Sequence, residues 1–83
     1  MGIPPLSPHY RLYGNRLRAD SAIMAAILDS WCDINCSGDW DIQKGGGWIN
    51  FGLRLEDDLM LFLLSSEYAY IGNPVVVKYP ITA

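Results

Sequence analysis

Apolar residues recur at spacings of three and four through the segment 21–36, which is the pattern of an amphipathic helix. Its inward face is expected to carry one apolar stripe, formed by Ile23, Met24, Ile27, Leu28, Trp31 and Ile34. Asp20 or Ser21 can accept a hydrogen bond from a free amide at the helix start, and Gly38 is suited to the position just past the helix end. The pattern therefore predicts one helix with a single buried face.

Two further segments alternate between apolar and polar residues on either side of the glycines 45–47. Such alternation indicates strands with one buried face, and the short glycine loop predicts that they form an antiparallel hairpin. The residues expected to face the core are Trp40, Ile42, Ile49, Phe51 and Leu53. The alternating segment 9–13 and the valine-rich segment 75–79 are predicted to be the first and last strands.

A second helix is predicted over residues 58–66, because the acidic residues 56–58 favour a helix start. The segment 68–72 fits neither helix nor strand clearly. The predicted order is β-α-β-β-α-β, an α+β fold of the ferredoxin-like type, with a four-stranded antiparallel sheet and two helices on one face. The 83 residues are expected to form one domain, 1–83, in which the proline-containing segment 1–8 is an extended arm.

The second helix holds more apolar residues than one buried face can use. Leu59–Leu64 are six consecutive apolar residues, whereas a helix turns only one stripe toward its own sheet. If Leu59, Phe62 and Leu63 face inward, the residues left on the outer side are Met60, Leu61 and Leu64. Two interpretations stay open: a partner protein or a second copy covers these residues, or the segment after residue 67 folds over them.

The sheet face without helices is a second candidate surface. It is expected to carry Arg11, Tyr13, Trp48, Asn50 and Arg54. Tyr13, Trp48 and Arg54 are therefore candidate partner-binding residues. Because RNA-recognition motifs stack bases on aromatic residues of the first and third strands, Tyr13 and Trp48 also leave RNA binding open as an alternative. The net charge of −3 and a pI near 4.7 disfavour binding to a polyanion, and we do not expect nucleic acid as a partner.

No motif in the sequence points to catalysis or to a cofactor. Cys32 and Cys36 are four residues apart, so they lack redox-motif spacing, and a structural zinc site needs four ligands. The glycines 45–47 precede a predicted strand, whereas a phosphate loop precedes a helix. We expect no catalytic residue, metal or cofactor. Without a signal peptide or a membrane-spanning apolar run, we expect a cytoplasmic protein that does not contact membranes.

Two stretches resemble a pattern in small proteins of tailed bacteriophages. In that pattern a tryptophan-cysteine helix end, like Trp31-Cys32, leads to a glycine, and a strand leads to an acidic residue and a Phe-x-Leu helix, like Asp58–Leu64. The resemblance covers residues 28–64 and brings no catalytic residues. It implies a phage context, where small acidic proteins inhibit host or bacterial-defence machinery, anti-CRISPR proteins among them.

These observations together predict a non-enzymatic interaction protein, a phage inhibitor that docks on a host or defence protein in the host cytoplasm. Met60, Leu61 and Leu64 are the expected contact residues for such a partner or for a second copy. An RNA-recognition-like binder and a minor virion component are the alternatives.

Overall fold

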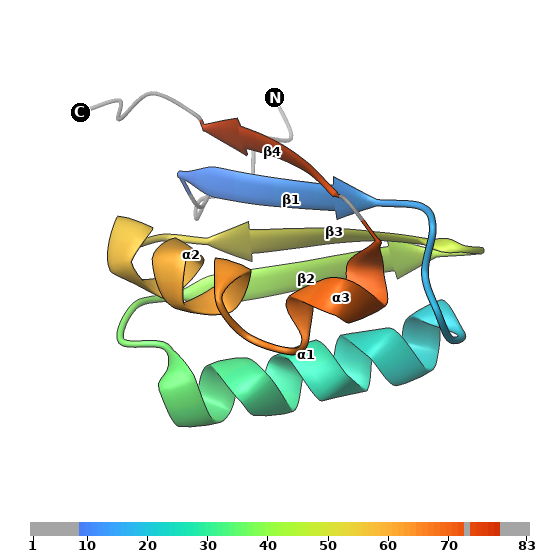
Figure 1. Cartoon of the computed structure of the whole chain (residues 1–83), viewed down its shortest axis with the longest axis horizontal. Coiled ribbons are helices and arrows are strands. Elements are labelled where there is room, and N and C mark those ends of the chain that lie inside the picture. Colours follow the sequence, from blue (N-terminus) through green and yellow to red (C-terminus); the bar gives the residue numbers. More distant parts are fainter. Residues whose placement is uncertain (1–8, 73, 79–83) are drawn as a thin grey trace, which may run out of the picture.

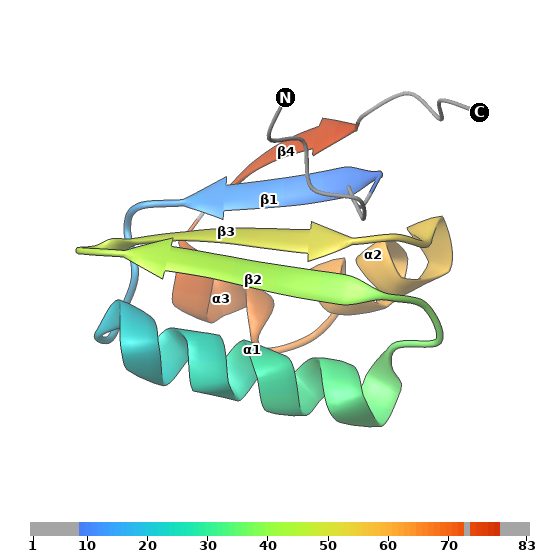
Figure 2. The same cartoon turned by 180° about the vertical axis from the view of Figure 1, so that it is seen from behind.

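Four strands form one antiparallel sheet in the order β2-β3-β1-β4, in a computed structural model that describes residues 9–72 and 74–78. Along the chain the elements are β1 (Tyr10–Gly14), α1 (Ser21–Asn35), β2 (Trp40–Gly45), β3 (Trp48–Leu53), α2 (Glu56–Leu63), α3 (Tyr68–Ile71) and β4 (Val75–Lys78). All three helices lie on the same side of the sheet (Figures 1 and 2). The predicted α+β class and the four-stranded antiparallel sheet are confirmed.

The buried face of α1 is rotated relative to the prediction. Met24 and Leu28 are fully buried, but Ile23 and Ile34 are 55% and 80% exposed, so their predicted place in the core is wrong. In a helix of 3.6 residues per turn, Ile23 projects about 100° away from Met24. Ile34 lies on the same flank. The sheet contacts the stripe centred on Met24 and Leu28, and this flank falls outside it.

Both ends of α1 have clear local causes. The carboxylate of Asp20 accepts a hydrogen bond from the Ala22 amide at 3.0 Å, which makes Asp20 the N-cap. The helix ends earlier than predicted, with Cys36 as its C-cap, so Gly38 is not the residue that terminates it. Gly38 is required for another reason: a Cβ there would lie 2.6 Å from Cγ of Leu55.

The predicted hairpin of β2 and β3 is confirmed. Gly45 pairs with Trp48, which leaves Gly46 and Gly47 as a two-residue turn, and Gly47 adopts a φ of 82° that suits glycine. The inward residues of β3 are fully buried. Those of β2, Trp40 and Ile42, are only half-buried because β2 is an end strand of the sheet.

The chain after β3 forms two helices where one was predicted. α2 begins at Glu56, two residues earlier than expected, and ends at Leu63. The short helix α3 follows and buries Ile71, whose side chain lies where a Cβ on Gly14 would be. Phe62 occupies the centre of the core, with its ring centroid 5.2 Å from that of Trp31 and 5.0 Å from that of Phe51.

Some predictions concern residues outside the described part of the chain. The expected extended arm, 1–8, and the end of the last predicted strand at Tyr79 both lie there. Within the described residues, no helix is long and apolar enough to cross a membrane.

Candidate protein-interaction surfaces

The outer side of α2 and its C-cap residue Leu64 carry three exposed apolar side chains, which we call the α2 surface: Met60, Leu61 and Leu64. Their exposed fractions are 52%, 50% and 84%, whereas Leu59 and Phe62 on the inner side are 7% and 0% exposed. The predicted division of the helix into an inner and an outer side is therefore confirmed. Whether the outer side binds a partner is a separate question.

Residues 68–72, the described part of the chain that directly follows residue 67, do not cover the α2 surface, contrary to one of the two interpretations left open by the sequence. Tyr68 turns its ring toward Phe62, with 6.1 Å between the centroids, and packs against the core. Ile71 is buried, and Tyr70 is itself 39% exposed. The three side chains thus stay accessible although α3 follows directly in the chain.

A buried carboxylate fixes the rotation of α2. Asp58 is 1% exposed, and its two oxygens accept hydrogen bonds from the backbone amides of Ser37, at 3.0 and 3.2 Å, and Gly38, at 2.9 Å. These bonds tie the first turn of α2 to the turn that follows α1. Glu56 and Asp57 stay exposed, as expected of acids at a helix start. All three acids lie in the first turn of α2 as predicted, but the run of acids did not predict that Asp58 is buried.

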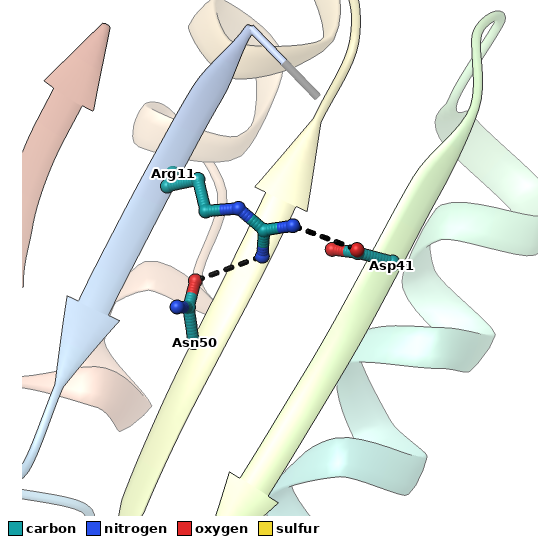
Figure 3. A network of polar contacts seen from close by, with 3 residues as sticks. All are labelled: Arg11, Asp41 and Asn50. Carbon is teal, nitrogen blue, oxygen red and sulfur yellow. Dashed lines mark hydrogen bonds and ion pairs between the residues drawn. The ribbon is translucent and has the colours of Figure 1, made fainter. Parts of the chain in front are cut away.

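The open face of the sheet carries a polar network across three strands (Figure 3). Nη2 of Arg11 on β1 lies 2.8 Å from Oδ2 of Asp41 on β2, and Nη1 donates to Oδ1 of Asn50 on β3 at 3.0 Å. Gly52 pairs with both Arg11 and Asp41 in the sheet register. Because Gly52 has no side chain, the guanidinium of Arg11 can cross β3 and reach Asp41.

Tyr13 and Trp48 stack on each other on the same face. Their ring centroids are 6.1 Å apart with an interplanar angle of 24°, and Tyr13 is 44% exposed. The predicted gathering of Arg11, Tyr13, Trp48 and Asn50 on one face is thus confirmed. Arg54 lies just past the end of β3, and its Nε is buried without a hydrogen-bond partner among the residues that the structure describes.

The cysteines are poorly suited to nucleophilic or ligand chemistry. Both are free thiols, with Cys32 buried and Cys36 half-buried. Removal from solvent raises the pKa of the Cys32 thiol well above its ordinary value, and burial also raises the pKa of Cys36. Both therefore stay protonated at neutral pH, and the thiolate is the reactive form. Within the residues that the structure describes, no group of three potential metal ligands comes together.

A shallow groove of about 390 Å³ runs between α1 and the end strand β2. Its lining residues are Ala22, Ala25, Ala26, Asp29, Trp40, Asp41, Ile42 and Lys44. Nε1 of Trp40 donates a hydrogen bond to Asp29 at 3.1 Å, and Asp41 is already paired with Arg11. The groove thus offers the methyl groups of three alanines, the side chains of Trp40 and Ile42, and two carboxylates that each already bind one partner.

No protein-family model, curated protein or solved structure matches this chain. The resemblance to phage proteins therefore stays a prediction.

Proposed function

We propose that this domain is a non-enzymatic protein-binding module that docks on a larger partner through the α2 surface. The observation that carries the proposal is the exposure of Met60, Leu61 and Leu64, which the following helix α3 leaves uncovered. Fully burying an exposed side chain of this kind contributes about 1.5–3 kcal/mol, and Met60 and Leu61, at about half exposure, have about half of their surface left to bury. Three such side chains on one short helix provide a compact apolar anchor.

The charges near this anchor favour a partner with a basic rim. Glu56 and Asp57 are exposed on the first turn of α2, and the chain has a net charge of −3. Complementary charges around an apolar centre raise the association rate and exclude wrong partners. The phage resemblance supports a more specific proposal, an inhibitor of a host or bacterial-defence protein that acts in the host cytoplasm.

We also propose that the fold is of the ferredoxin-like type, with α3 as an addition to its six elements. The antiparallel sheet of order β2-β3-β1-β4 and the helices on one side of it support this proposal.

The docking proposal can be tested by capture from bacterial lysate with the tagged protein. The matched variants are Leu64→Ser and Ile34→Ser, since Leu64 is 84% exposed on α2 and Ile34 is 80% exposed on α1. A protein captured by the wild type should be retained by Ile34→Ser. With Leu64→Ser, its affinity in a calorimetric titration should fall about five- to 150-fold. Equal capture by both variants would place the interface elsewhere.

RNA binding by the open sheet face is the second candidate, and the Tyr13–Trp48 stack is the observation that favours it. The electrostatics of that face oppose it, because Asp41 pairs with the guanidinium of Arg11. We therefore rank it below docking through α2.

A further inference from the structure

β4 is an end strand of the sheet, and it is apolar along its whole centre. Val75, Val76 and Val77 are 63%, 41% and 40% exposed, and Lys78 at the end of the strand is exposed too. One edge of β4 pairs with β1. In the described part of the chain, no strand pairs with its other edge.

Among the described residues, nothing covers either face of β4, because the helices lie under other strands. α1 packs against β2 and β3, and α2 packs against β3, so β4 extends past the layer of helices (Figures 1 and 2). Val76 is on the helix side of the sheet, where its pairing partner Leu12 is fully buried, yet Val76 stays 41% exposed. On the open face, Val75 pairs with Tyr13, which is also exposed.

Natural proteins use charges, prolines, bulges or a covering element to keep an end strand from pairing with another chain. β4 has such devices only at its ends, with Pro74 before it and Lys78 as its last residue. Its three central residues are β-branched, which suits them to a strand. β4 is therefore short enough to avoid extended aggregation and apolar enough to pair with one more strand.

The residues of β2, the strand at the opposite end of the sheet, indicate which strand would pair with β4. β2 carries Asp41, Gln43 and Lys44, so pairing of β4 with β2 of another copy would set valines beside charged and polar side chains. Such head-to-tail pairing would also continue without closing. Pairing of β4 with β4 of a second copy about a two-fold axis places valines beside valines. Each copy contributes one β4 edge, so the assembly closes as a dimer.

We propose that a second copy of this chain pairs with β4 in antiparallel orientation, so that the two four-stranded sheets become continuous. This interface is distinct from the α2 surface, and it does not depend on the proposed function. Four residues per chain bury less than the roughly 1,200–2,000 Å² of a standard interface. The dimer is accordingly weak, with a dissociation constant of about 10 µM to 1 mM.

The pairing can be tested with variants that place complementary charges on β4. Sedimentation equilibrium of the purified full chain measures how much of it is dimeric. Val76 is near the middle of β4, so each copy brings its residue 76 close to the two-fold axis. Wild type should approach twice the 9.3 kDa of one chain at high concentration. Val76→Lys and Val76→Glu, each alone, should raise the dissociation constant about tenfold or more, because like charges then face each other. An equimolar mixture of the two variants should recover dimers.

The matched control is Ile23→Lys, which places the same charge at an apolar residue that is 55% exposed on α1. It should dimerise as the wild type does, and circular dichroism should show every variant folded, since all the changed side chains are exposed. A wild type that stays monomeric at about 1 mM would overturn the proposal. So would dimers that persist in both Val76 variants, or a mixture that does not recover them. None of these results would affect capture of a different protein through the α2 surface.

Discussion

Asp58 and Arg11 are charged residues that each hold separate parts of this domain together. The Asp58 carboxylate accepts backbone hydrogen bonds from the turn after α1, and the Arg11 guanidinium joins three strands on the open sheet face. In both cases the charged group is largely buried, at 1% exposure for Asp58 and 11% for the Arg11 side chain. Removing one partner of a buried charged contact leaves the other unsatisfied, which is more harmful than losing an exposed ion pair.

Asp58→Ala should destabilise the domain by about 2–4 kcal/mol, because the amides of Ser37 and Gly38 lose their acceptor inside the protein. The neighbouring Asp57→Ala is the control, since Asp57 is exposed on the same turn and its loss should change the free energy of unfolding by no more than about 0.5 kcal/mol. Urea unfolding followed by tryptophan fluorescence measures both. Equal effects of the two substitutions would mean that the Asp58 bonds contribute little.

Neither of these contacts could be predicted from the sequence. Asp58 stands in a run of three acids, and a helix start explains all three equally well until α2 is seen beside the turn at Ser37. Arg11 and Asp41 were expected in strands, but their contact needs the register that sets Gly52 between them. Contacts of this kind depend on how strands align, and local spacing carries no information about that.

The two long helices show how far periodicity alone can place a buried face. In α2 the side that carries Leu59 and Phe62 is buried as predicted, although the opposite side with Met60, Leu61 and Leu64 is equally apolar. In α1 the isoleucines Ile23, Ile27 and Ile34 form a second stripe beside Met24 and Leu28. Both stripes are apolar, and the sheet covers the one that contains Met24. The sequence pattern could not distinguish them.

The division of α2 into two sides predicts opposite effects for two adjacent residues. Phe62→Ser removes a ring in contact with Trp31, Phe51 and Tyr68, and should cost about 3–5 kcal/mol, comparable with the entire stability of a small domain. Leu61→Ser changes a side chain that is 50% exposed and should barely move the melting temperature. Thermal unfolding followed by circular dichroism compares them. Severe destabilisation by Leu61→Ser would assign that residue to the core and remove it from the α2 surface.

At the scale of the whole molecule, the order of strands and helices was predictable because each element has its own local signal. The hairpin has its glycine turn, α1 has its cap at Asp20, and α2 begins with a run of acids. The short helix α3 has no such signal, since its four residues are too few to show a period. The α2 surface was predictable because Leu59–Leu64 exceed what one face can bury. The apolar edge at β4 was not identified, because only the sheet order shows which strand lies at the end.

The overall charge decides between the two candidate surfaces, and it leads to a prediction about RNA. The chain has 6 lysines and arginines against 9 acids, and on the open face Arg11 is paired with Asp41. Phosphate contacts supply most of the affinity of nonspecific binding and weaken as salt rises, so the Tyr13–Trp48 stack would have to bind bases against net repulsion. At about 0.15 M salt, where the screening length is roughly 8 Å, fluorescence anisotropy should detect no binding to single-stranded RNA. Micromolar affinity that Tyr13→Ala or Trp48→Ala abolishes, while Leu64→Ser leaves it unchanged, would instead make the open sheet face the functional surface.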